Sequence, residues 1–152
     1  MVAPNGVGVP AFLEAIKEGK SGITFQQKLK DLNFSCQVGG VPIISEEQKL
    51  AYFTPLQLRN FHSNGILYGV MAGMEALNDA NISPALKEDN PLWNLGIVFG
   101  VATSGVEKFR EAINKIDEGN VRRLGSTAVV QTMVSGVSAY LSGMIGAGNW
   151  VT

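Results

Sequence analysis

Residues able to do chemistry are few and scattered in this chain of 152 residues, which has one cysteine, Cys36, and one histidine, His62. Cys36 lies in a segment that we expect to be a short strand, where the default is a buried and inert thiol. His62 lies inside an expected long helix, where an ordinary surface or hydrogen-bonded histidine is the simplest interpretation. Nucleophilic catalysis would need an activating partner for either residue, and the sequence indicates none.

Metal, cofactor and nucleic-acid chemistry have little support. A zinc site needs several closely placed His, Cys or carboxylate ligands, but the carboxylates fall singly on expected helix faces. The net charge of −1 gives no broad attraction to nucleic acid or an anionic membrane. No aromatic residues are interleaved with basic ones, as a single-strand binding surface would require. We therefore expect no metal, no cofactor, no nucleic-acid partner and no membrane partner.

A glycine-rich turn from Gly100 to Gly105 is the best candidate for anion binding, because it follows an expected strand and opens an expected helix. Backbone N–H groups at such a helix start can hold a phosphate. No Lys-Ser or Lys-Thr follows the last glycine, which argues against a Walker loop. A small nucleotide-binding α/β domain stays open as one alternative.

The composition combines 45% hydrophobic with only 16% charged residues. Soluble domains usually contain about 25% charged residues, so we expect a partner or further polypeptide to cover much of the surface. The longest apolar stretch, Ala128 to Ile145, contains Ser, Gln and Gly and predicts a buried helix rather than a membrane span. A single cysteine and the lack of an evident signal peptide favour a reducing, cytoplasmic location.

Expected helices and strands alternate along the chain, which predicts an α/β layered fold. The helices are expected at Ala11–Glu18, from the Thr54-Pro55 start to about Ala80, at Gly105–Ile116, and from Ser126 or Thr127 through Gly143. The strands are expected at Ser35–Val38, at Leu95–Gly100 as a central strand apolar on both faces, and from Asn149 onward. Gly39-Gly40 is expected to end the first of them.

Two helix faces carry specific expectations. Gly65, Gly69 and Gly73 recur every four residues, so each loses helix propensity and a closely packed neighbour is expected against them. In the helix from Gly105, the solvent-exposed (wet) side is expected to carry the charged residues Glu107, Lys108, Arg110, Glu111 and Lys115.

Both termini fall inside expected structure. Gly146-Ala147-Gly148 is read as a turn after an apolar helix, and Asn149 to Thr152 begins a strand with no polar tail. The opening segment enters a Pro/Gly loop directly. We therefore expect a piece of a larger protein, with exposed apolar surface and self-association.

Several segments, in order, resemble the N-terminal half of the β-ketoacyl-[acyl-carrier-protein] synthases. They are the opening loop Val2–Gly8, the helix around Phe12 to Lys17, the Lys20–Ile23 turn, the helix end Gly73–Ala80, the strand and turn Leu95–Gly105, and Met133–Gly136 followed by Gly143 and Gly146. The resemblance spans nearly the whole chain, through order and spacing rather than through one motif.

The resemblance implies that residues 1–152 form an N-terminal domain fragment with a partial thiolase-like layered αβαβα fold, whose first strand and nucleophile strand are incomplete. It implies decarboxylative condensation of acyl and malonyl thioesters, with an acyl carrier protein as partner and a homodimer or heterodimer as assembly. The family's nucleophilic cysteine would follow Thr152, and its histidines would come later. Cys36 and His62 match none of these positions, so no catalytic residue is assigned and the chain alone is expected to be inactive.

Three substrate-pocket residues follow from the same resemblance. Thr103 matches a gate residue at the end of the acyl pocket, and Val130 and Gln131 match residues that line the pocket, partly across a dimer interface. Ordinary packing is the alternative for all three. A non-catalytic subunit, like the chain-length-factor partners of type II polyketide synthases, is the alternative for the whole chain.

Overall fold

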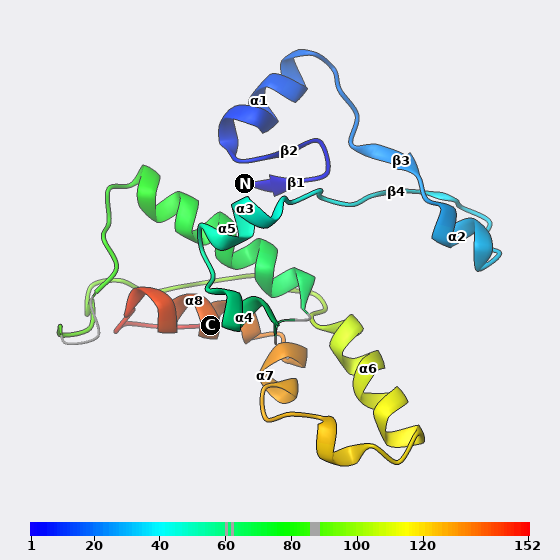
Figure 1. Cartoon of the computed structure of the whole chain (residues 1–152). Helices are drawn as coiled ribbons and strands as arrows, with labels where there is room; N and C mark the ends of the chain where they lie inside the picture. The colour runs from blue at the N-terminus through cyan, green and yellow to red at the C-terminus, as the bar shows by residue number, and fades with distance from the viewer. Residues whose placement is uncertain (60, 62, 86–88) are drawn as a thin grey trace. The chain divides into compact units, whose positions relative to one another are not determined.

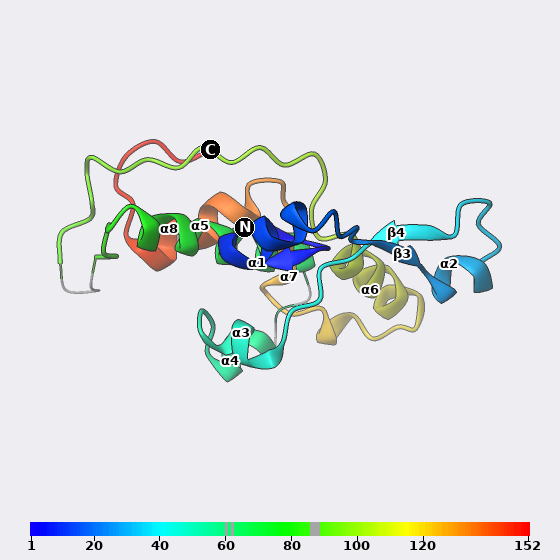
Figure 2. The same cartoon turned by 90° about the horizontal axis from the view of Figure 1, so that it is seen from above.

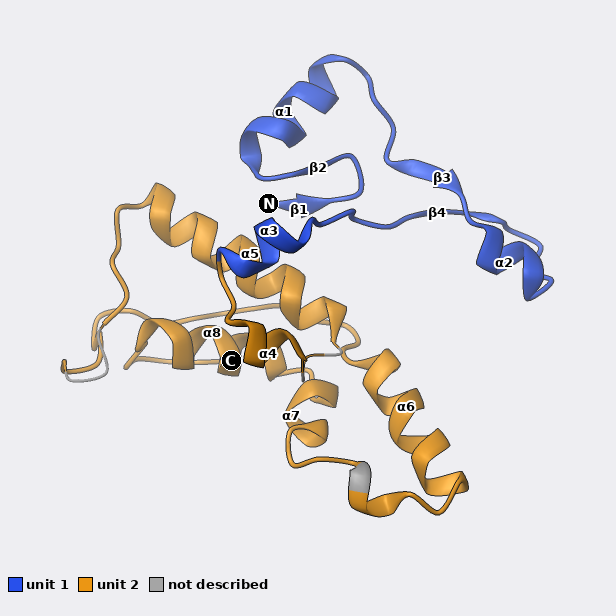
Figure 3. Cartoon of the chain, in the orientation of Figure 1, with its two compact units in different colours: residues 1–51 blue, residues 52–152 orange. Residues whose placement is uncertain are grey.

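The structure is a computed structural model that describes residues 1–59, 61, 63–85 and 89–152, with the backbone alone at Arg123. The chain separates into two compact units, Met1–Ala51 and Tyr52–Thr152 (Figure 3). The expected central strand and the candidate pocket residues all lie in the second unit.

The first unit begins with an antiparallel hairpin of β1 (Val2–Ala3) and β2 (Gly6–Val7), followed by α1 (Val9–Lys17) (Figure 1). Pro10 stands in the first turn of α1, where a missing N–H has little cost. Gly19 follows the helix with a φ of +66°, a left-handed conformation that glycine adopts without strain. The predicted first helix is therefore confirmed.

A second antiparallel pair joins β3 (Ile23–Phe25) to β4 (Val38–Gly40), with α2 (Gln27–Asp31) between them. The predicted strand at Ser35–Val38 is misplaced, because Gly39 and Gly40 belong to the strand instead of ending it. Close packing explains Gly40, because a Cβ there would lie 2.7 Å from Cγ of Pro4. Cys36 lies before this strand and is exposed, so the expected burial of its thiol is wrong.

The first unit ends with α3 (Glu46–Leu50), and the second begins with α4 (Pro55–Arg59). Ser45 and Gln48 cap α3 reciprocally, and Thr54 and Gln57 exchange the same two bonds at the start of α4. The predicted helix start at Thr54 and Pro55 is confirmed.

The predicted single helix from Pro55 to about Ala80 is wrong, because α5 (Asn64–Asp79) begins separately. Ser63 precedes α5 with an extended backbone (φ −99°, ψ 102°), which a continuous helix does not allow. His62, expected inside that helix, lies outside the described residues.

The core of the second unit lies between α5 and α8 (Gly136–Ile145), which run side by side (Figures 1 and 2). A Cβ on Gly69 would overlap Val137, and one on Gly73 would overlap Leu141. The expected close neighbour is thus confirmed at these two glycines. Gly65 has only Ser104 Oγ nearby, at 3.9 Å from such a Cβ, so the expectation fails there.

Between these helices come α6 (Val106–Asp117), the short 3-10 helix η1 (Val121–Arg123) and α7 (Ala128–Thr132). The predicted helix at Gly105–Ile116 is confirmed. The predicted continuous helix from Ser126 or Thr127 to Gly143 is wrong, because Met133 is extended (φ −75°, ψ 143°) and separates α7 from α8. The chain bends so tightly there that a Cβ on Gly136 would lie 2.6 Å from the carbonyl oxygen of Val130.

Two extended segments, residues 95–99 and 149–152, run in parallel beside each other. Trp150 O accepts from Ile97 N at 2.8 Å, and Ile97 O accepts from Thr152 N at 3.0 Å, the slanted pattern of a parallel pair. The extended backbone expected at both places is confirmed, although only isolated bridges form. Ile97 is 7% exposed but Val98 is 82% exposed, so one face is uncovered instead of both being buried.

Candidate functional site

A hollow of about 240 Å³ lies beside the Gly100–Gly105 turn. The turn, the first half of α6 and the end of α7 form its wall, through Ala102, Thr103, Ser104, Val106, Phe109, Thr132 and Val134. Most of these side chains are apolar, as is usual where a protein binds an apolar group. Thr103 therefore lies beside this hollow, and its role in an acyl pocket stays a prediction.

Gly105 fixes the turn against α7. Its φ of +64° is left-handed, and it is the residue that precedes the first turn of α6. A Cβ at this position would overlap the carbonyl oxygen of Gln131. Two independent restrictions, conformation and space, thus require glycine here.

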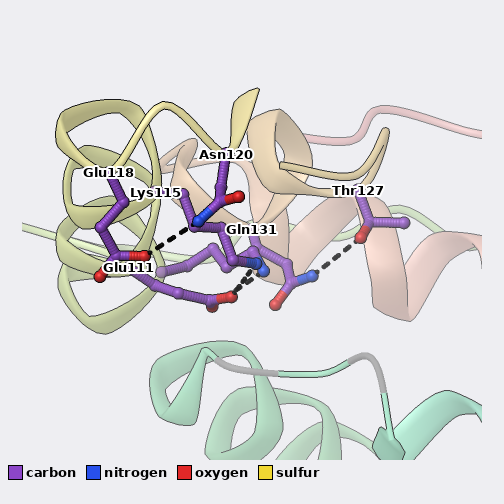
Figure 4. A network of polar contacts seen from close by, with 7 residues as sticks. Glu111, Lys115, Glu118, Asn120, Thr127 and Gln131 are labelled. Carbon is purple, nitrogen blue, oxygen red and sulfur yellow. Dashed lines mark hydrogen bonds and ion pairs between the residues drawn. The ribbon is translucent and has the colours of Figure 1, made fainter. Parts of the chain in front are cut away.

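Gln131 is fully buried, and it is not among the residues that line the hollow. Its amide donates to Thr127 Oγ1 at 3.2 Å, and Figure 4 shows the amide between Thr127 and the charged side chains of α6. Val130 is 39% exposed. The described wall of the hollow contains Thr103 and Thr132 but neither Val130 nor Gln131. In this single chain the three predicted pocket residues are therefore not brought together.

A cluster of charged residues lies on the face of α6 that meets α7 (Figure 4). Lys108 Nζ lies 2.9 Å from Glu111 Oε2, and Lys115 pairs with the other oxygen of Glu111. We call these three residues, together with Thr127 and Gln131, the polar seam. The Lys108 side chain is only 7% exposed, so its predicted place on the wet side of the helix is wrong.

The sequence carries a partial signal for the polar seam. Gln131 is a polar residue within an apolar run, and Lys108, Glu111 and Lys115 share one helix face by their spacing of three and four. The sequence pattern did not reveal that α7 packs on that face, because contact between two helices depends on tertiary structure. The usual preference of lysine for solvent therefore predicts an exposed position for Lys108.

Two serine hydroxyls of the second unit are buried without a hydrogen-bond partner in the described part of the chain: Ser63 Oγ and Ser104 Oγ. Ser63 precedes α5 without bonding to its first turn, and Ser104 precedes the start of α6. Unpaired buried hydroxyls have a free-energy cost of about 1–3 kcal/mol each. Their Oγ atoms are closed off from solvent, so they offer no open binding site.

A second hollow, of about 270 Å³, lies between α5, α8 and the extended segment 95–99. Gly73, Leu77, Leu141 and Ile145 form its helical side. This hollow lies directly against the half-covered parallel pair. An apolar side chain supplied by another polypeptide segment would suit it.

The described residues contain no group of three or more His, Cys, Asp or Glu side chains that could hold a metal ion. Within the same residues, every helix is too short or too polar to cross a membrane. Cys36 is exposed, and its Sγ lies 3.8 Å from the carbonyl oxygen of Val38. The structure thus shows a hollow and its supporting helices, but no assembled nucleophile and base among these residues.

The fold is that of the ketosynthases, as a partial thiolase-like layered α/β fold. A crystal structure of a β-ketoacyl synthase from Burkholderia phymatum STM815 superposes with a TM-score of 0.75 at 20% identity, covering 97% of this chain and 35% of that one. The ishigamide ketosynthase/chain length factor gives a TM-score of 0.72 at 15% identity. The superposition covers 99% of this chain and 36% of that one. The predicted fold class is confirmed.

Curated relatives give the same result from sequence. The chain is 29% identical over 144 residues to 3-oxoacyl-[acyl-carrier-protein] synthase 1 of Escherichia coli K12, covering 93% of this chain and 34% of the relative. It is 31% identical over 134 residues to 3-oxoacyl-[acyl-carrier-protein] synthase 1 of Buchnera aphidicola. This match covers 86% of this chain and 31% of the relative. The 3-oxoacyl-[acyl-carrier-protein] synthase 2 of Vibrio harveyi is 27% identical over 146 residues. This match covers 96% of this chain and 34% of the relative.

These similarities confirm the resemblance to the β-ketoacyl-[acyl-carrier-protein] synthases over most of the chain. No family model matches the sequence. The chain spans about a third of the length of the curated relatives that it matches.

Proposed function

We propose that this chain is part of a β-ketoacyl-[acyl-carrier-protein] synthase, which joins acyl and malonyl thioesters by decarboxylative condensation in fatty-acid or polyketide synthesis. The observation that carries the proposal is the 29% identity to a 3-oxoacyl-[acyl-carrier-protein] synthase over 93% of the chain. Such an enzyme works on acyl carrier protein, in the cytoplasm, as a homodimer or heterodimer. These partners and this compartment belong to the proposal.

In this proposal the chain supplies pocket walls rather than reactive groups. The hollow beside Thr103 holds the end of the acyl chain, because apolar walls favour burial of methylene groups at about 0.8 kcal/mol each. Val130 and Gln131 contribute to the pocket once the whole assembly forms. The cysteine thiolate and the histidine donors that condensation needs are provided outside this chain.

Binding of acyl thioesters tests the pocket. The purified chain is titrated calorimetrically with hexanoyl-, octanoyl- and decanoyl-pantetheine. We expect binding that strengthens with chain length until the hollow is filled. The matched variant is Thr103→Leu, which should narrow the hollow and weaken decanoyl binding most. Equal, unsaturable heats for all three thioesters would contradict the proposed pocket.

A condensation assay tests whether the chain by itself carries the groups needed for catalysis. The chain is incubated with acyl-carrier protein and radiolabelled malonyl-carrier protein, with the Escherichia coli synthase as positive control. We expect no β-ketoacyl product and no acylation of Cys36 by mass spectrometry. Product formed by the chain alone would show that it carries its own catalytic groups.

The same preparation tests the alternatives. Titration with ATP and NAD examines the nucleotide-binding reading, for which saturable heat at the Gly100–Gly105 turn would be required. A chain-length-factor-like subunit would instead associate stably with a ketosynthase subunit that keeps its own cysteine. Sedimentation of the mixture with such a subunit reports that association.

A further inference from the structure

The extended segment at residues 95–99 uses only one of its two edges. The N–H groups of Ile97 and Phe99 donate to the parallel neighbour at the end of the chain. Successive residues of an extended chain direct their backbone groups to opposite edges. Gly96 and Val98 therefore direct theirs away from the neighbour, and within the described residues these N–H and C=O groups make no hydrogen bond.

Burial alternates along the same segment. Ile97 is 7% exposed, whereas Val98 is 82% exposed and Gly96 is also exposed. The second hollow, of about 270 Å³, includes Gly96 and Val98 in its wall. Unused backbone groups and an apolar hollow are thus available together, and these are the two features by which a sheet edge binds an added strand.

The sequence places no barrier on this edge. Proteins usually keep exposed edges from pairing with other chains by charged side chains or proline. Residues 90–106 include no charged residue, and their one proline, Pro91, lies outside the extended segment. Two copies of the edge therefore meet without like-charge repulsion, which would otherwise oppose a cross-strand pair.

The segment is complementary to a second copy of itself when the two run antiparallel. With Ile97 opposite Ile97 of the second copy, Gly96 of each copy stands opposite Val98 of the other. Every unused N–H group then meets an unused C=O group. The exposed side chain of Val98 also faces a glycine, so no second side chain competes for its space.

We infer that residues 95–99 form a self-pairing strand, by which two copies of the chain associate as a two-fold antiparallel pair with Ile97 at the axis. The parallel pair of each copy continues into one sheet that contains two segments from each copy. Each copy also covers the second hollow of the other. The occupant of this edge is a second copy of the chain, and neither an acyl ligand nor the proposed function is needed for the pairing.

Amide hydrogen exchange in the unmodified chain tests which groups pair. Exchange is followed by NMR at low micromolar and at near-millimolar concentration. The amides of Gly96 and Val98 should become protected by about 10-fold or more at the higher concentration only. The amide of Ile97, bonded to Trp150 O at 2.8 Å, should be protected at both. Equal protection of Gly96 and Val98 at both concentrations would mean that the same copy fills the edge, and exchange that is fast at both would mean that no strand pairs there. Either result would overturn the inference.

A charge on the edge tests whether general stickiness explains the association. Val98→Lys is compared with Ile43→Lys, because Ile43 is 88% exposed in the first unit and belongs to no helix or strand. Sedimentation equilibrium should show a dissociation constant raised by about 10-fold or more in Val98→Lys and by less than about 2-fold in Ile43→Lys. Loss of any exposed apolar group would weaken both alike, so equal effects would contradict edge pairing.

Cross-linking tests the register. Val98→Cys and Gly100→Cys are each combined with Cys36→Ser, so that one thiol per copy reacts with a short bismaleimide. Gly100 has open space for a side chain. In the antiparallel register the two Val98→Cys positions form a diagonal pair about 7–8 Å apart. The two Gly100→Cys positions lie about 20 Å apart along the strands. We expect a cross-linked dimer from Val98→Cys alone. Efficient cross-linking of both would indicate a parallel pair in register, and cross-linking of neither would indicate no pair; each result would refute the proposed arrangement.

Discussion

Gly105 and Gln131 are in direct backbone contact, with the α-carbon of the glycine against the carbonyl oxygen of the glutamine. Two segments that are 26 residues apart in sequence therefore meet without a side chain between them. The contact joins the start of α6 to α7 at the edge of the hollow that contains Thr103.

Gly105→Ala should lower the free energy of unfolding by about 3 kcal/mol. The left-handed backbone costs an L-residue roughly 1–2 kcal/mol, and overpacking against a carbonyl adds about 1–3 kcal/mol. Gly119→Ala is the matched control, because Gly119 has a φ of +74° and open space around it. It should cost only about 1 kcal/mol in urea unfolding. Equal losses in the two variants would show that the contact with Gln131 contributes nothing.

Two glycines of α5 should respond to alanine with opposite signs. Gly65→Ala meets only Ser104 Oγ at 3.9 Å, so improved helix propensity should stabilise the chain by about 0.5 kcal/mol. Gly69→Ala should instead destabilise it by about 2 kcal/mol, because the new methyl overlaps Val137, whose branched side chain has little freedom in a helix. Thermal unfolding of both variants measures the difference. Stabilisation by Gly69→Ala would mean that α5 and α8 do not pack this closely.

Removing either of two hydroxyl groups should also change the free energy of unfolding, but in opposite directions. Ser104→Ala removes a buried hydroxyl that has no described hydrogen-bond partner, so stability should stay the same or rise by up to about 1 kcal/mol. Thr54→Ala removes the oxygen that caps Gln57 N at 3.3 Å and should cost about 1 kcal/mol. Urea denaturation of the two variants reports both values. A large loss in Ser104→Ala would reveal a partner for that hydroxyl.

The uncovered face of the parallel pair should make the isolated chain self-associate. Val98 and Trp150 are 82% and 74% exposed on neighbouring extended segments. Exposed apolar groups on a strand edge promote pairing with other chains. We expect concentration-dependent sedimentation and binding of a hydrophobic dye, both reduced by Val98→Lys. A sharp monomer boundary without dye binding would contradict this expectation.

Local signals account for the parts of the fold that were predicted correctly. Pro10 and Gly19 bound α1, and the Thr54-Pro55 start holds because a cap depends on residues only a few positions apart. The order of segments was enough to indicate a ketosynthase-like fold, which the structural neighbours confirm.

Tertiary contacts decided what the local signals missed. The helix expected from Pro55 to Ala80 ends before Ser63, and the helix expected up to Gly143 is interrupted at Met133, although both runs look continuous in hydrophobicity. Gly39 and Gly40 look like strand breakers but pair within β4. At Gly40 and at the bend before Gly136, a close packing neighbour outweighs a propensity of less than about 1 kcal/mol per residue.

The candidate site also combines features set by local sequence with features set by tertiary contacts. The sequence by itself determined that Thr103 follows an extended segment and precedes a helix, because glycine and the apolar run define that turn locally. Only the tertiary structure decided that Gln131 is buried without lining the hollow and that Lys108 is buried. The physical reason is that backbone conformation follows from neighbours along the chain, whereas burial of a charge depends on which distant segments of the chain cover it.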